Sequence, residues 1–106
     1  MQVTNWNIEA MTGYKPLTTI YQDFSIADAF GESAIRDTYN RIFDEWKGNY
    51  KYLTEFVMAL NWKIWEHHEK NYQIATIYNE LWEKADNYAI ENLKDDELTY
   101  FFQTTD

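Results

Sequence analysis

Apolar residues recur every three or four positions through most of the chain, which is the spacing of an amphipathic helix. This period predicts helices over 19–30, 32–47, 50–68 and 72–92, and a short fifth helix that Asp95 or Asp96 would cap. The apolar positions expected to face the core are Ile20, Phe24, Ala27, Ile35, Tyr39, Ile42, Phe43, Trp46, Leu53, Phe56, Val57, Leu60, Ile64, Ile74, Ile77, Tyr78, Leu81, Ala85, Tyr88, Ala89, Leu98, Phe101 and Phe102.

Polar residues and glycines between these segments mark the expected helix ends. Thr19, with Gln22 three residues later, predicts an N-terminal capping box, and Asn49 and Asn71 are further predicted caps. Gly31 and Gly48 are predicted helix stops. The connections between the segments are short, so consecutive helices should run antiparallel.

The chain therefore reads as a single all-α domain over residues 1–106. Strand-like alternation is absent beyond the N-terminal segment, and only three glycines and one proline occur. We expect a compact four- to five-helix bundle, preceded by a mostly irregular or short extended segment over residues 1–17.

Composition narrows the function classes. Cysteine is absent, which excludes a disulfide scaffold, a cysteine-based metal site and a thiol nucleophile. The net charge of -9 argues against direct nucleic-acid binding and against binding to anionic lipid. No secretory signal or membrane-spanning stretch is visible, so we expect a cytoplasmic protein.

The two histidines, His67 and His68, stand between Glu66 and Glu69 and suggest a metal site. Adjacent helical residues point about 100° apart, however, so both rings cannot easily reach one ion. Our preferred interpretation is a polar last helical turn, where histidine is favoured by the helix dipole. We predict no metal and no cofactor, and keep an enzyme or metal protein that uses these four residues as an alternative.

Other catalytic patterns are weak. Ser25 and Ser33 lie in no nucleophile motif, and the glycines are too scattered for a phosphate loop. We therefore predict a protein that is not an enzyme.

Acidic residues are concentrated near the C-terminus. Residues 1–70 hold ten acids and seven bases, whereas 71–106 hold eight acids and two bases. Glu80, Glu83 and Glu91 fall near one face of the predicted fourth helix, and Asp86 lies to one side. With Asp95, Asp96 and Glu97 they form a row of carboxylates that could compete with nucleic acid for a basic groove.

Aromatic residues make up 19% of the chain, more than the apolar stripes can bury. Several fall partly off the stripes, namely Trp62, Trp65, Trp82, Tyr50, Tyr52 and Tyr72. We expect some of these to be exposed or to lie at an interface. Tryptophan and tyrosine carry binding energy at interfaces, so we predict Trp62, Trp65 and Trp82 as anchors beside the acidic residues. Such a surface suits a basic, arginine-rich protein partner.

The runs FSIADAFG, AIRDTYN, LTEFVMALNWKIWEH and LWEKADNYAIENLKDDELTYFFQTTD resemble small acidic proteins carried by mobile elements of Firmicutes, over residues 18–106. Such elements encode anti-restriction and anti-CRISPR proteins, many of them short, acidic and helical. The resemblance implies a non-enzymatic inhibitor that binds a nuclease complex of host defence, with a type II CRISPR nuclease as the leading target. The alternative is a structural or assembly module that forms a homodimer or a hetero-oligomer through its exposed aromatics.

Overall fold

A computed structural model describes residues 17–105, apart from the side chain of Trp46, and places five helices in that range. They are α2 (Leu17–Asp28), α3 (Glu32–Trp46), α4 (Tyr50–His67), α5 (Tyr72–Asn92) and α6 (Asp95–Thr105). The predicted all-α bundle is confirmed, and each boundary falls within two residues of its prediction where one was given. The predicted irregular segment lies outside the described residues, except that Leu17 is already the first residue of α2.

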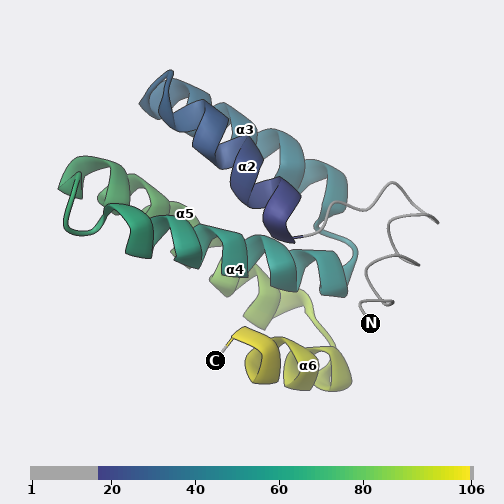
Figure 1. Cartoon of the computed structure of the whole chain (residues 1–106). Helices are drawn as coiled ribbons and strands as arrows, with labels where there is room; N and C mark the ends of the chain where they lie inside the picture. The colour runs from purple at the N-terminus through teal and green to yellow at the C-terminus, as the bar shows by residue number, and fades with distance from the viewer. Residues whose placement is uncertain (1–16, 106) are drawn as a thin grey trace.

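The helices form two antiparallel pairs and a final short helix (Figure 1). The pair α2 and α3 lies on the pair α4 and α5, through contacts of α2 with α4 and of α3 with α5. The last helix, α6, packs on the other side against α4. Since α4 contacts all four other described helices, it is the centre of the bundle. Within residues 17–105, no helix combines the length and the apolar character needed to cross a membrane.

The helix starts follow two different rules. Asn49 caps α4 by accepting hydrogen bonds from the backbone N–H groups of Lys51 and Tyr52, at 3.1 and 3.2 Å, and Asn71 caps α5 in the same way. The predicted cap at Thr19 is wrong, because α2 already begins at Leu17. The N–H of Leu17 instead donates to the Glu55 carboxylate of α4 at 2.8 Å. A tertiary contact thus satisfies the donor that a local cap would have satisfied.

Gly31 joins α2 to α3 with a φ of 104°, a backbone conformation that suits glycine and strains other residues. The N–H groups of Phe30 and Gly31 both bond to the carbonyl of Ala27, which closes the end of α2. The turn returns the chain beside α2.

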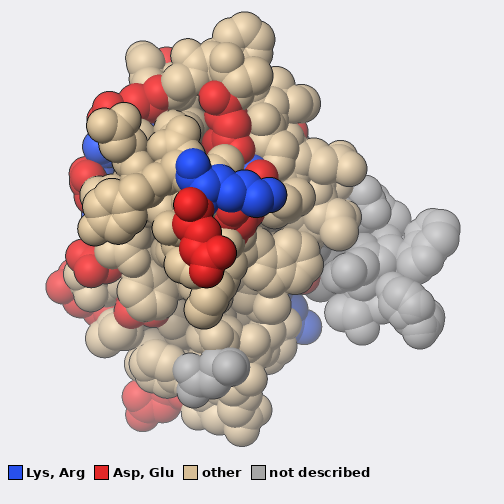
Figure 2. Space-filling model, turned by 60° about the vertical axis from the view of Figure 1, so that its left-hand side comes forward, with Lys and Arg blue, Asp and Glu red and all other residues tan. Residues whose placement is uncertain are grey.

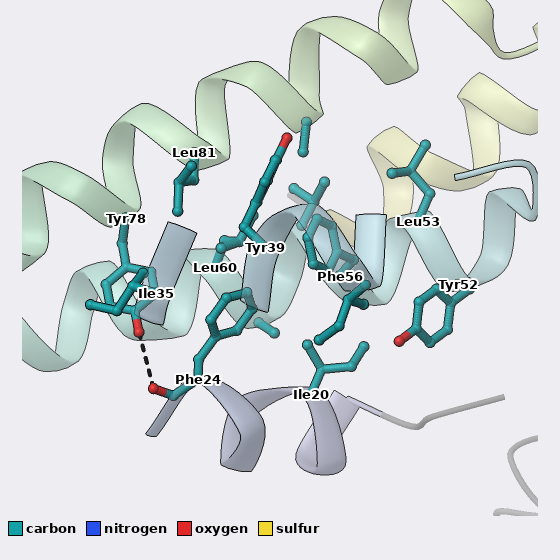
Figure 3. Close-up of a cluster of buried hydrophobic side chains, with 14 of the residues drawn as sticks. Ile20, Phe24, Ile35, Tyr39, Tyr52, Leu53, Phe56, Leu60, Tyr78 and Leu81 are labelled. Carbon is teal, nitrogen blue, oxygen red and sulfur yellow. Dashed lines mark hydrogen bonds between the residues drawn. The ribbon is translucent and has the colours of Figure 1, made fainter. Parts of the chain in front are cut away.

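Aromatic rings and aliphatic side chains together fill the middle of the bundle (Figure 3). Phe24 packs edge-on against Tyr78 and tilted against Phe56, with ring centroids 5.5 and 6.0 Å apart, and Tyr39 also contacts Phe56. Phe101 is fully buried and fastens α6 to the bundle, whereas Phe102, predicted to dock as well, remains 42% exposed. Tyr52, one of the six aromatics of which some were expected to be exposed or interfacial, is buried, because its face of α4 turns toward the core.

Candidate functional site

The predicted acidic row does not form one uniform surface. Glu83, Glu91, Asp95 and Asp96 are exposed, and the ion pairs among the described residues involve none of them. Glu97 is half-buried and accepts a hydrogen bond from the backbone N–H of Lys94 at 3.0 Å, so it serves to cap α6. The predicted cap at Asp95 or Asp96 is wrong, because both residues already lie in the first turn of α6.

Glu80 differs from the other exposed acids because α3 provides it with a cation. The Arg36 guanidinium donates to both Glu80 oxygens, at 3.0 and 3.2 Å, and to Glu32 at 2.8 Å. The hydrogen bonds and the charge of Arg36 hold the pKa of Glu80 below its ordinary value. Glu80 is therefore paired within the molecule with a cation that it shares with Glu32, and the unpaired part of the row begins at Glu83.

A lysine separates the members of this row further. Lys84 lies on the helical face between Glu80 and Glu91, and its Nζ is 5.7 Å from the centre of the Tyr39 ring of α3. Figure 2 views the molecule from the side of the α4–α5 turn, and there the acidic side chains occur in separate groups among uncharged ones. The charge distribution is patchy on that face.

The three tryptophans predicted as anchors belong to two different surfaces. Trp62 and Trp65 project from α4 and are 42% and 65% exposed, with Trp62 packed edge-on against Tyr21 of α2. Trp82 is half-buried on α5, where it lines a groove between α4, α5 and α6 together with Asp86. The predicted anchors and acids therefore do not assemble into a single site.

Two more exposed aromatic residues lie at the end of the bundle where α2 and α4 finish. Tyr72 and Phe30 are each 77% exposed, and Phe30 was not among the aromatics predicted to be accessible. Tyr72 lines a hollow with His68, whose ring touches Trp65, and a second hollow with Glu32 next to the Phe30 turn. Phe30, Trp65 and Tyr72 thus form an aromatic end of the bundle, which we call the aromatic tip.

A polar cluster lies between α2 and α4, centred on the fully buried side chain of Lys63. Its Nζ contacts the carboxylates of Asp28 and Glu66 at 2.7 and 3.0 Å, and donates to the Ser25 hydroxyl at 2.9 Å. The Tyr21 ring adds a cation–π contact at 4.8 Å. Two hydrogen bonds, to Ser25 and Glu66, and the ion pair with Asp28 make burial of this charge tolerable.

The carboxylates of the cluster have further partners. Asp28 accepts from the Tyr78 hydroxyl at 2.5 Å and contacts His67 Nε2 at 2.9 Å, while the Tyr21 hydroxyl donates to Glu66. Burial acts to raise the pKa of Glu66, but the hydrogen bonds from Tyr21 and Lys63 outweigh it and hold the pKa below its usual value. Burial and the bond to Asp28 raise the pKa of the Tyr78 phenol, which keeps it a donor.

Only part of the ligand set of the alternative metal site comes together in the structure. Glu66 and His67 do come together, but with Asp28 rather than with His68 and Glu69, and the ligand atoms of these three residues lie within 4.8 Å of one another. His68 and Glu69 instead form an exposed pair at 3.5 Å. Lys63 Nζ already lies beside Asp28 and Glu66, where it supplies the positive charge that a metal ion would bring. The cluster is therefore complete as an internal ion-pair network.

Sequence reasoning missed Asp28 and Lys63 although a signal was present. Position 63 lies on the same helical face as Leu60 and Phe56, so a lysine there interrupts the apolar stripe of α4. A charged residue on a core stripe indicates a buried partner. The identity of that partner depends on how α2 packs on α4, and local sequence patterns do not predict this packing.

Comparison of the chain with protein-family models, with curated proteins and with solved structures gave no match.

Proposed function

We propose that the protein is a non-enzymatic inhibitor that binds a positively charged, nucleic-acid-processing complex of host defence. The observation that carries the proposal is the group of exposed carboxylates Glu83, Glu91, Asp95 and Asp96, which have no cation partner among the described residues. Carboxylates that are not paired internally keep their full attraction for a basic groove.

Two further observations support a binding role. The polar cluster around Lys63, the strongest candidate for chemistry, has its donors and acceptors paired with one another. The resemblance to anti-defence proteins of mobile elements favours a nuclease as target, and a type II CRISPR nuclease has the positive channel that such a surface would occupy.

The test is a guided-nuclease cleavage assay with the purified protein over a series of salt concentrations. We expect inhibition that weakens as salt rises, because the binding charges are exposed and screened by ions. Adding the protein before or after loading of the guide RNA locates the blocked step. If no type II nuclease is inhibited, that target is excluded.

Paired variants identify the surface responsible. The double reversal Glu83→Lys with Glu91→Lys should weaken inhibition at least about tenfold, through lost attraction and new repulsion. The double reversal Asp37→Lys with Glu45→Lys on α3 changes the net charge equally and should have a much smaller effect. Equal effects of the two pairs would show that only total charge matters and would contradict the proposed surface.

A second candidate function is assembly, and the aromatic tip favours it. Phe30, Trp65 and Tyr72 expose large apolar surface at one end of the bundle, as residues at subunit interfaces do before association. This candidate predicts a dimer mass in dilute solution, loss of the dimer in Trp65→Ala with Tyr72→Ala, and indifference to the α5 charge reversal. A monomer at all concentrations would exclude the homodimer.

A further inference from the structure

The groove that holds Trp82 and Asp86 is built by three helices. Each contributes side chains three or four positions apart, which therefore share a helical face. The lining residues are Val57, Met58 and Asn61 of α4, Trp82 and Asp86 of α5, and Phe102 and Thr105 of α6. The volume is about 220 Å³, below the range of about 300 Å³ and more that is usual for small-molecule sites. Its size suits one long side chain.

Asp86 is a half-buried carboxylate with no hydrogen bond or ion pair to any described residue. Burial alone raises the pKa of Asp86, and no nearby cation acts against it. The side-chain amide of Asn61, another residue that lines the groove, likewise takes part in none of the hydrogen bonds of the described residues. The groove therefore presents a carboxylate and a side-chain amide that are only half-buried and are left open to a donor from outside.

The chain's own cations near Asp86 in sequence are directed elsewhere. Lys84 lies over the Tyr39 ring on the α3 side of α5. Lys94 directly precedes α6, and its backbone N–H donates to Glu97. Neither lines the groove.

The chemistry of the walls selects the occupant. A carboxylate excludes an anion, and a purely apolar side chain would bury Asp86 further without a partner. A guanidinium satisfies both requirements, because its planar face stacks on aromatic rings and its edge donates to carboxylate and amide oxygens. Ammonium groups are more strongly hydrated and offer no flat face to Trp82 or Phe102.

We propose that this groove binds an arginine side chain of a partner protein, with Asp86 and Asn61 as acceptors and Trp82 and Phe102 as walls. The inference deepens the proposed function and rests on it for the identity of the partner. Recognition of the arginine itself is a property of the groove and can be tested without any nuclease.

The test uses the full chain and the peptide acetyl-Gly-Arg-Gly-amide. Its counterpart with citrulline has nearly the same shape but no charge. Binding is followed by NMR through the indole N–H signals of the five tryptophans, with the Trp82 signal assigned from the Trp82→Phe variant. We expect the arginine peptide to shift the Trp82 signal more than those of Trp62 and Trp65, and to bind at least about tenfold more tightly than the citrulline peptide. Equal binding of the two peptides, or no shift at Trp82, would overturn the proposal.

Matched variants test whether the Asp86 carboxylate is the group that binds the arginine peptide. Asp86→Asn should weaken binding of the arginine peptide about tenfold or more, whereas Asp96→Asn removes the same charge from an exposed position and should leave it nearly unchanged. Unchanged binding in Asp86→Asn would exclude the carboxylate as the acceptor. The comparison of the two peptides on the unaltered chain does not depend on how any variant folds.

The two proposals can fail separately. Peptide binding at Trp82 without inhibition of any nuclease would refute the proposed function but support the proposal that the groove binds arginine. Inhibition that is equally potent in Asp86→Asn, with no peptide binding, would refute arginine binding by the groove but support the proposed inhibitory function.

Discussion

Two aspartates, Asp28 and Asp86, show what separates a completed site from an open one in this bundle. Both are half-buried on helices that pack against α4. Asp28 contacts Lys63 at 2.7 Å, His67 at 2.9 Å and the Tyr78 hydroxyl at 2.5 Å. Asp86 has no such partner among residues 17–105 and opens onto a groove.

The comparison shows that partial burial of an aspartate does not by itself indicate whether it stabilises the fold or binds a partner. At Asp28 the bundle supplies its own buried cation, so the cluster holds α2 on α4. At Asp86 burial has a cost that no internal interaction offsets, as is common at binding sites. Three perturbations test this contrast, and they differ strongly in expected size.

The largest effect is expected for Lys63→Met. Methionine fills most of the space, but it leaves Asp28 and Glu66 facing each other without their cation. The free energy of unfolding should fall by about 3–5 kcal/mol, the range for breaking a buried ion pair by removal of one partner. Urea denaturation followed by circular dichroism measures this change.

Lys70→Met is the matched control, because Lys70 is exposed and has no ion pair with another described residue. Its effect should stay within about 0.5 kcal/mol. A similar small effect of Lys63→Met would mean that the cluster contributes little to stability. Adding Asp28→Asn and Glu66→Gln to Lys63→Met should restore part of the loss, since fewer charges are then left unpaired.

An intermediate effect is expected from pH, with opposite signs at the two sites. The pKa of Glu66 is lower in the folded protein than its ordinary 4.5, so the unfolded chain binds protons first as pH falls. The stability contributed by Glu66 is therefore present above about pH 4.5 and is lost as pH falls below it. The pKa of Asp86 is raised above its ordinary 3.8, so protonation of Asp86 favours the folded state.

Urea denaturation at pH 7 and at pH 4 separates the two contributions. Glu66→Gln should lose less stability between these pH values than the unaltered chain, whereas Asp86→Asn should lose more. Identical pH dependence in all three proteins would contradict both assignments.

The smallest effect is expected for Asp86→Asn at pH 7. Removing a half-buried charge that has no partner should raise the free energy of unfolding slightly, by less than about 0.5 kcal/mol. Thermal unfolding measures the sign, with Asp96→Asn as the control. A clear loss of stability would show that Asp86 has a structural partner and would remove its contrast with Asp28.

The helices were predictable because their signals are local. The three- and four-residue period located all five described helices, and the asparagine side chains at positions 49 and 71 set the starts of α4 and α5. The start of α2 was missed because Glu55, far away in sequence, replaces a cap there.

The candidate sites were less predictable. Exposure of Trp62, Trp65 and Tyr72 followed from their positions off the apolar stripes, and the structure confirms it. The helical spacing of Glu80 and Glu83 gave no sign that Arg36 of α3 forms an ion pair with Glu80 and none with Glu83. Phe102 lines the groove and does not enter the core, because the packing of α6 determines its position.

The sequence by itself determined the helical class, nearly all helix boundaries, the apolar stripes and the concentration of acid after residue 70, because periodicity, capping and charge are properties of neighbouring residues. Only the tertiary structure decided which charges are paired. Ion pairs between helices and the grooves between them depend on which helices pack together. Asp28 therefore pairs with Lys63 and Glu80 with Arg36, whereas Asp86 faces an open groove.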